Sequence, residues 1–234
     1  MQIFYVPGVS GDSCVMDENE SRHCIRVLRM HKGERVKMVD GMGGWHEGII
    51  TDPDPSACRV RITESTAEFG KRGYRLHMAV SPVKNQERFE WFIEKSVEFG
   101  IDEITPLICR NTEKHGIKTA RINSIIVSAM KQSLKAYRPV LNEASGFSEF
   151  IASGHTATKM IAHCNPGHDL IKMDSVYRKG TDALILIGPE GDFSDEEISL
   201  ALNAGFTGIS LGKSRLRTET AGIAACHSVH FINQ

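Results

Sequence analysis

One uninterrupted apolar run, Ala183-Leu184-Ile185-Leu186-Ile187, constrains the fold of this 234-residue chain more than any other segment. Five consecutive apolar residues without alternation are typical of a strand that is buried on both faces. Such strands occur in parallel sheets whose two faces are covered by helices. The run therefore predicts an α/β domain with this strand near the centre of its sheet.

The chain alternates between strand and helix patterns from residue 75 onward. A helix with an apolar face follows the first strand and ends at Gly100, and a long helix ends before Pro139. Ser194 and Glu197 form a capping box at the start of a further helix, and a last helix is predicted over 218–232. Besides the apolar run, strands are expected over 75–80, 104–109, 158–163 and 207–211.

The N-terminal part of the chain has a different pattern, with short strands separated by turns. One helix is predicted over 18–29, and Gly70-Lys71-Arg72-Gly73 is a plausible linker. We therefore predict a small β-barrel or sandwich over residues 1–72 and the α/β domain over 73–234. The expected strands of the first domain are 2–6, 35–39, 45–51 and 58–62.

The net charge of −1 hides a segregation of charge along the chain. Residues 22–37 hold six Lys or Arg against Glu34, and residues 110–138 hold seven against Glu113. Acidic residues gather between 182 and 197, where no basic residue occurs. Because phosphate contacts depend on local basic residues, the two basic segments suit a polyanionic partner, although each could also be a solvated helix face.

Several classes of protein are disfavoured by what the sequence lacks. No apolar run approaches the ~18 residues of a membrane span, and the first residues do not form a signal peptide. The six cysteines are far apart and the histidines show no metal-binding spacing, so free thiols in the cytoplasm and no metal are expected. Gly212-Lys213-Ser214 does not make a P-loop, since the required first glycine would fall inside a strand.

Two glycine-containing loops follow predicted strands that we expect to be adjacent in the sheet. One is Gly188-Pro189-Glu190-Gly191-Asp192-Phe193, and the other runs from Gly212 to Thr220. Ligands of open α/β sheets bind at the carboxyl ends of the strands, where glycine lets a ligand approach the backbone. The same residues could also be tight turns with a helix cap at Thr218.

The two loops resemble the cofactor site of a known family. Ile187-Gly188-Pro189-Glu190-Gly191, with Leu211-Gly212 and Leu216-Arg217-Thr218-Glu219-Thr220-Ala221, is similar to the small-subunit ribosomal RNA uridine N3-methyltransferases, the RsmE family of the SPOUT (knotted) superfamily. Further matches cover nearly the whole chain: His23 with Arg26-Val27-Leu28-Arg29, Asp40-Gly41, Lys84 ahead of Glu94-Lys95-Ser96-Val97-Glu98-Phe99-Gly100, and Ile104-Thr105-Pro106.

The resemblance implies an N-terminal PUA-like β-barrel, a C-terminal SPOUT-type knotted parallel-sheet domain, and a homodimer with S-adenosyl-L-methionine bound near the interface. Two departures from the family pattern occur, at Asp192, where a second glycine is frequent, and at Lys131-Gln132 with Lys135. The cofactor-binding residues it implies are Leu186, Ile187, Gly188, Pro189, Glu190, Gly191, Leu211, Gly212, Leu216, Arg217, Thr218, Glu219 and Thr220, and the RNA-binding residues are Arg22, His23, Arg26, Arg29, Lys84 and Lys95.

The implied reaction is methyl transfer to N3 of a uridine in small-subunit ribosomal RNA. N3 must lose its proton, so a fixed cation beside the neighbouring carbonyl oxygens would help, and we assign this role to Arg217. A surface pairing of Arg217 with Glu219 is the alternative for that side chain, and no general base is assigned. The alternatives for the protein are a related methyltransferase acting on another RNA or base, and a dimer that binds ribosomal RNA without catalysis.

Overall fold

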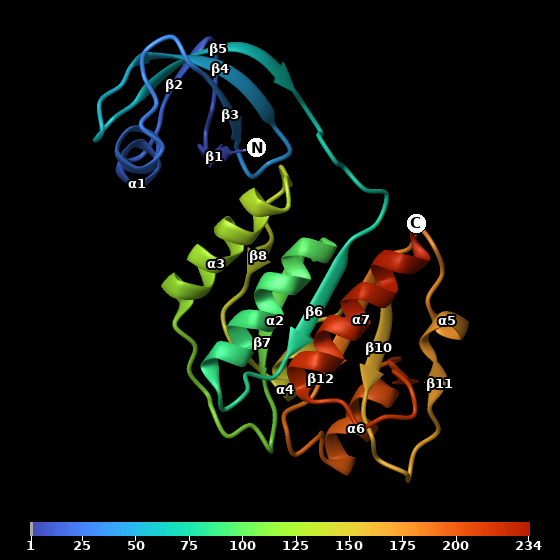
Figure 1. The fold of residues 1–234 in the computed structure, drawn as a ribbon. Helices are drawn as coiled ribbons and strands as arrows, with labels where there is room; N and C mark the ends of the chain where they lie inside the picture. Colours follow the sequence, from blue (N-terminus) through green and yellow to red (C-terminus); the bar gives the residue numbers. More distant parts are fainter. Residues whose placement is uncertain (1) are drawn as a thin grey trace. The chain divides into compact units, whose positions relative to one another are not determined.

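The computed structural model describes residues 2–234 and divides the chain into two compact units (Figure 1). One unit holds the chain up to Lys71 together with Val127–Arg138, and the other holds Arg72–Ile126 together with Pro139–Gln234. Helix α3 (Thr119–Gln132) therefore begins in the second unit and ends in the first. The first unit is built from two separate stretches of sequence.

A curled five-stranded sheet forms the first unit (Figure 1). Its strand order is β1-β3-β4-β5-β2, with β1 parallel to β3 and the remaining pairs antiparallel. Strand β2 is absent from the sequence prediction, because three residues are too few for a visible alternation. The strands are β1 (Ile3–Tyr5), β2 (Ser13–Val15), β3 (Arg35–Val39), β4 (Trp45–Asp52) and β5 (Arg59–Thr66).

The helix predicted over 18–29 consists of two shorter helical segments. Helix α1 (Glu18–Arg22) starts at Asp17, whose carboxylate accepts the N–H of Glu20 over 2.8 Å. A π-helical turn, η1 (His23–Val27), continues it, and Arg29 then takes a left-handed φ of 57°. The helix therefore ends earlier than the periodicity indicates.

The stretch Val127–Arg138 completes the first unit through close contacts with α1 and with the turn between β3 and β4. The N–H of Gly43 donates to the carbonyl of Ala136 over 3.0 Å, and Lys131 forms a salt bridge with Glu20. Gly43 has a φ of +98°, and a Cβ there would lie 2.4 Å from the ring of Tyr137. Only glycine meets both conditions at this position.

The second unit contains an eight-stranded sheet in which every recorded pairing is parallel. Its order is β11-β13-β10-β12-β6-β7-β8, and β9 also pairs with β7. Strand β12, the apolar run, is buried throughout and lies between β10 and β6, as expected for a central strand. The strands are β6 (Leu76–Val80), β7 (Glu103–Ile108), β8 (Val140–Leu141), β9 (Ser145–Gly146), β10 (Thr158–Ala162), β11 (Ile171–Lys172), β12 (Ala183–Ile187) and β13 (Thr207–Ser210).

Helices cover the faces of this sheet. Helix α2 (Gln86–Phe99) packs beside α7 (Thr218–Ile232), where Phe92 lies against Gly222. Leu184 and Leu186 enter a hydrophobic core with residues of α4 (Phe147–Ala152) and α6 (Asp195–Asn203). A short helix, α5 (Met173–Val176), follows β11. The helices thus bury β12 on both sides, as the sequence predicts.

The predicted capping box is present at the start of α6. The hydroxyl of Ser194 accepts the N–H of Glu197 over 3.2 Å, and the Glu197 carboxylate accepts the N–H of Ser194 over 2.9 Å. The six cysteines are free, and Cys164 is exposed whereas four of the others are buried. Among residues 2–234, none of the helices combines the length and apolar character that a membrane span requires.

Candidate functional site

The strand order corrects one expectation about the site. Strands β12 and β13 are not adjacent, because β10 lies between them and pairs with both, Ile161 being opposite Leu186 on one side and Gly208 on the other. Strand order depends on long-range crossover connections, which local periodicity does not report. The carboxyl end of β10 therefore lies between the two glycine-containing loops.

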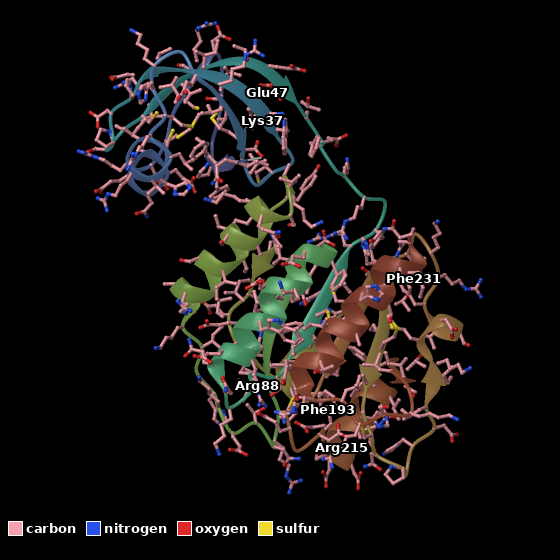
Figure 2. All side chains as sticks on the ribbon, in the orientation of Figure 1. Lys37, Glu47, Arg88, Phe193, Arg215 and Phe231 are labelled. Carbon is pink, nitrogen blue, oxygen red and sulfur yellow. The ribbon has the colours of Figure 1, made fainter. Side chains whose placement is uncertain are left out.

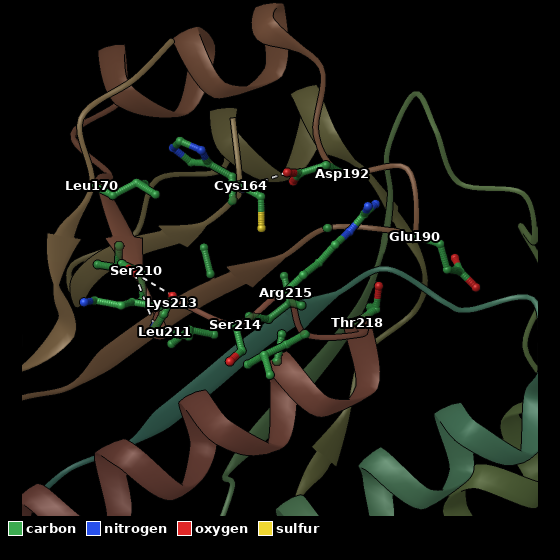
Figure 3. A pocket seen from close by; sticks show the side chains of 18 of the residues that line it. Cys164, Leu170, Glu190, Asp192, Ser210, Leu211, Lys213, Ser214, Arg215 and Thr218 are labelled. Carbon is green, nitrogen blue, oxygen red and sulfur yellow. Dashed lines mark hydrogen bonds between the residues drawn. The ribbon is translucent and has the colours of Figure 1, made fainter. Parts of the chain in front are cut away.

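A cavity of about 620 Å³ lies at the carboxyl ends of these three strands (Figure 3). This volume is in the range of small-molecule sites, and the position is where parallel sheets bind their ligands. Both glycine-containing loops contribute to it, and so does the end of β10. The lining residues are Ala162, His163, Cys164, Leu170, Ile187, Gly188, Pro189, Glu190, Asp192, Ile209, Ser210, Leu211, Gly212, Lys213, Ser214, Arg215, Leu216, Thr218 and Ala221.

Eight of the thirteen predicted cofactor residues line this cavity: Ile187, Gly188, Pro189, Glu190, Leu211, Gly212, Leu216 and Thr218. Gly212 has a φ of +124° and open space where a Cβ would project, so backbone conformation, not crowding, calls for glycine there. The loops after β12 and β13 thus contribute jointly to one concave surface.

The other five predicted residues, Leu186, Gly191, Arg217, Glu219 and Thr220, lie outside the lining. Leu186 points into the sheet core, and a Cβ on Gly191 would lie 3.2 Å from the Cβ of Asn111. Glu219 is buried, with Arg88 of α2 as its salt-bridge partner at 3.8 Å. Among the described residues, no ion pair joins Glu219 to Arg217, so that alternative for Arg217 is not observed.

Arg217 occupies the N-cap position of α7 and is exposed. Its side chain makes no capping hydrogen bond. Arg215, two residues earlier in the same loop, lines the cavity instead. Sequence spacing could not show which of the two arginines enters the cavity, because the direction of a loop side chain depends on the backbone dihedrals.

Sequence reasoning also missed the end of β10 and the residue Asp192 as parts of the cavity. One oxygen of the Asp192 carboxylate accepts the N–H of Cys164 over 2.7 Å, and the other accepts the N–H of Phe193 over 2.8 Å (Figure 3). Asp192 has a φ of +61°, the left-handed conformation that glycine adopts easily and that aspartate tolerates. Aspartate at this position therefore takes a conformation that a glycine would also adopt, and it adds a carboxylate.

His163, also missed, lines the cavity next to Cys164 and is itself buried. It is 5% exposed, and its Nε2 atom has no hydrogen-bond partner among residues 2–234. Burial lowers the pKa of His163, an effect that the nearby Asp192 carboxylate partly offsets. The imidazole of His163 is therefore favoured in its neutral form beside the Asp192 carboxylate.

The predicted RNA-binding residues are divided between the two units. Arg22, His23, Arg26 and Arg29 belong to α1, η1 and the turn that follows, where Arg22 forms a salt bridge with Glu18. Lys84 and Lys95 belong to the second unit, and Lys95 lies within 2.8 Å of the carboxylates of both Glu94 and Glu98. Among residues 2–234, no cluster of three or more His, Cys, Asp or Glu could hold a metal ion.

The chain combines a small N-terminal β unit with a parallel α/β sheet that has a ligand-sized cavity at its carboxyl edge. Known proteins share this architecture. The RNA methyltransferase domain family matches residues 71–230, and the RNA methyltransferase PUA domain family matches residues 17–63. The chain belongs to the RNA methyltransferase family. The predicted fold class, a parallel-sheet domain of the knotted SPOUT class with an N-terminal PUA-like barrel, is confirmed.

Individual relatives extend over nearly the whole chain. A probable rRNA-methyltransferase from Porphyromonas gingivalis is 38% identical with a TM-score of 0.93, covering 100% of this chain and 98% of that chain. A ribosomal RNA small subunit methyltransferase E from Neisseria gonorrhoeae, bound to S-adenosyl methionine, is 26% identical with a TM-score of 0.90 over 100% and 98%. A ribosomal RNA small subunit methyltransferase E from Rickettsia conorii is 26% identical over 88% of this chain and 84% of its own length.

Proposed function

We propose that this protein transfers a methyl group from S-adenosyl-L-methionine to N3 of a uridine in small-subunit ribosomal RNA. The observation that carries the proposal is the cavity shared by the loops after β10, β12 and β13. Relatives that cover the chain almost completely are named as small-subunit ribosomal RNA methyltransferases, and one of them was crystallised with the methyl donor. The same proposal divides the chain into an RNA-binding barrel over residues 1–72 and a methyltransferase domain over residues 73–234.

The residues of the cavity are suited to the methyl donor. Its walls include apolar side chains such as Leu170, Ile209 and Leu216, which suit an adenine ring. The backbone around Gly188 and Gly212 offers polar partners. We assign the binding role mainly to the eight predicted residues that line the cavity, and a supporting role to Leu186, Gly191, Arg217, Glu219 and Thr220, which border them in the chain.

The sulfonium of the bound donor supplies an activated methyl group, so the main task of the protein is to orient the acceptor nitrogen. Uracil N3 must lose its proton, and the resulting charge is shared with the carbonyl oxygens. Arg217, exposed at the start of α7, remains our candidate for the guanidinium that binds such an oxygen. Its neighbour Thr218 lines the cavity, which supports this assignment.

The RNA partner must present an unpaired uridine, because N3 lies on the pairing edge of the base. We assign phosphate binding to Arg22, His23, Arg26 and Arg29 of the first unit, with Lys84 and Lys95 as weaker contributors. Glu94 and Glu98 already neutralise much of the charge of Lys95, and Lys84 forms a salt bridge of 3.0 Å with Glu113. Arg26 and Arg29 form no salt bridge among residues 2–234 and are therefore the principal part of the RNA-binding surface, with His23 and the Glu18-paired Arg22 beside them.

A homodimer in the cytoplasm is part of the proposal. Helix α7 exposes Phe231, a residue that is 70% accessible (Figure 2). Its ring stacks on His227 with 6.0 Å between centroids. His227 in turn contacts Phe99 of α2 at 4.9 Å. An exposed aromatic cluster on paired helices suits a second copy of the chain, and Phe231→Glu should shift the protein from dimer to monomer in light scattering.

Two measurements test the function. Labelled methyl groups should pass from S-adenosyl-L-methionine to small ribosomal subunits or their RNA, and nucleoside analysis of the product should find 3-methyluridine. A different methylated nucleoside, or transfer to another RNA, would support the related methyltransferase instead. RNA binding without any transfer would support the non-catalytic alternative.

Arg217→Ala tests the catalytic assignment separately. It should leave donor affinity nearly unchanged and remove most of the methyl transfer, since Arg217 does not line the cavity. Unchanged turnover would remove Arg217 from the mechanism.

A further inference from the structure

The two loops that border the cavity carry opposite charges. Glu190 and Asp192 lie on the loop after β12, and Lys213 and Arg215 lie on the loop after β13. Among residues 2–234, no salt bridge joins the acidic loop to the basic one. A cavity with separated acidic and basic sides is suited to a ligand that carries both charges.

The acidic side is already engaged with the backbone, whereas Arg215 is not. Both oxygens of Asp192 accept backbone N–H groups, and one oxygen of Glu190 accepts the N–H of Lys84 over 2.9 Å. Arg215 makes no hydrogen bond or ion pair with any other residue of the described part of the chain. Its guanidinium extends across the cavity toward Asp192 and Glu190 (Figure 3). All five of its donors are therefore available to a ligand.

Lys213 differs from Arg215 in direction. Its side chain lies beside Ser210 and points away from the acidic side of the cavity (Figure 3). The two residues have the same charge and belong to the same loop, so Lys213 provides a matched comparison.

We propose that Arg215 binds the carboxylate at the amino-acid end of S-adenosyl-L-methionine and so makes the site specific for the intact amino acid. This inference rests on the proposed function, because it assigns one end of the proposed donor. The carboxylate is the only anionic group of that molecule, and a planar guanidinium can bind it through two parallel hydrogen bonds. The ammonium of the same end then faces Glu190 and Asp192.

A competing role for Arg215 is contact with the RNA substrate, since the residue is exposed. The two roles differ in what they predict for the donor alone. A carboxylate-binding arginine changes donor affinity without RNA present, and only for donors that have the carboxylate. An RNA-binding arginine changes turnover at saturating donor and leaves donor affinity unaltered.

The test compares S-adenosyl-L-methionine with its decarboxylated form in calorimetric titrations of the full-length protein. The wild type should bind the intact donor more tightly by about 10- to 100-fold, the value of a charged hydrogen-bonded contact. Arg215→Gln should reduce this preference to about threefold or less by weakening only the intact donor, and Arg215→Lys should be intermediate. Lys213→Gln should keep the wild-type preference.

The outcomes separate this inference from the function on which it rests. An unchanged preference in Arg215→Gln overturns the inference, and a loss of turnover at saturating donor with unchanged affinities assigns Arg215 to the RNA. Failure of the wild type to bind either compound overturns the proposed function and the inference with it. Thermal unfolding of each variant checks that altered affinity does not come from a loss of folding.

Discussion

The carboxylate of Asp192 accepts the backbone N–H of Cys164 over 2.7 Å, and this bond joins the loop after β12 to the end of β10. The same side chain also accepts the N–H of Phe193, and Asn111 donates to the carbonyl oxygens of Asp192 and Gly191. Loops from three strands therefore meet at one residue. Asp192 links the backbone segments that form one side of the cavity.

Replacing Asp192 separates the contribution of its hydrogen bonds from that of its backbone conformation. Asp192→Ala should lower the free energy of unfolding by about 2–4 kcal/mol, because two bonds to a carboxylate are lost and alanine is strained at a φ of +61°. Asp192→Gly should cost about 1 kcal/mol less, since glycine adopts this φ freely. Urea denaturation measures both, and equal losses would contradict a conformational contribution.

Gly222 of α7 lies directly against Phe92 of α2. A Cβ at this position would lie 2.7 Å from ring atoms of Phe92, which is fully buried. Gly222→Ala should therefore destabilise the protein by about 1–3 kcal/mol through overpacking, in spite of the better helix propensity of alanine. Differential scanning calorimetry should show a lower Tm. Adding Phe92→Leu should recover part of the loss, and a simple sum of the two effects would argue against a direct clash.

His77 should make stability depend on pH. Burial lowers the pKa of His77 to about 4, although Glu103 opposes this effect, and the charges of His155 and Arg75 add to it. Below a pH of about 6.5 the unfolded chain binds a proton at His77, whereas the folded chain does not bind it until the pH approaches 4. The contribution of neutral His77 to the free energy of unfolding is therefore fully present above a pH of about 6.5. It falls by about 3 kcal/mol as the pH drops toward 4. Urea midpoints between pH 7 and 4.5 should show this slope, and His77→Gln should flatten it.

The RNA-binding assignment predicts a change in salt dependence. Each phosphate contact adds about 0.7 to the slope of log affinity against log salt for single-stranded RNA. Arg26→Ala and Arg29→Ala should each reduce the slope by about that amount. Lys179→Ala is a suitable control, because its ammonium donates to the carbonyl of Gln234. Unchanged slopes in both arginine variants would show that the first unit does not hold the RNA.

Local sequence predicted most of the second unit because most of its strands and helices have a pattern of their own, such as an apolar run or a capping box. The apolar run gave β12 with its observed bounds, and Ser194 with Glu197 gave the start of α6. Strands of two or three residues, such as β8 and β11, have no such signal. The resemblance supplied the barrel type, which short alternating strands do not specify.

The candidate site was predicted less completely, because a sequence pattern reports neither the direction of a loop side chain nor the order of the strands in a sheet. The position of β10 between β12 and β13 brings His163 and Cys164 to the cavity, and only the three-dimensional topology reveals this. Gly191, one of the predicted cofactor-binding residues, faces Asn111 and lies outside the cavity lining. The same limit applies to Arg215 and Arg217, whose sequence positions carry no information about which one enters the cavity.

The contact of Tyr137 with Gly43 bears on the order in which the protein can fold during synthesis. The first seventy residues leave the ribosome well before Tyr137 is synthesised. The curled sheet therefore lacks its contact with Tyr137 while nearly seventy further residues are added to the chain. At typical translation rates the delay is several seconds, long compared with the folding of small domains. A nascent chain stopped just before residue 127, with the curled sheet already outside the ribosome, should therefore be more easily cleaved by protease within its first strands than one stopped well beyond residue 138.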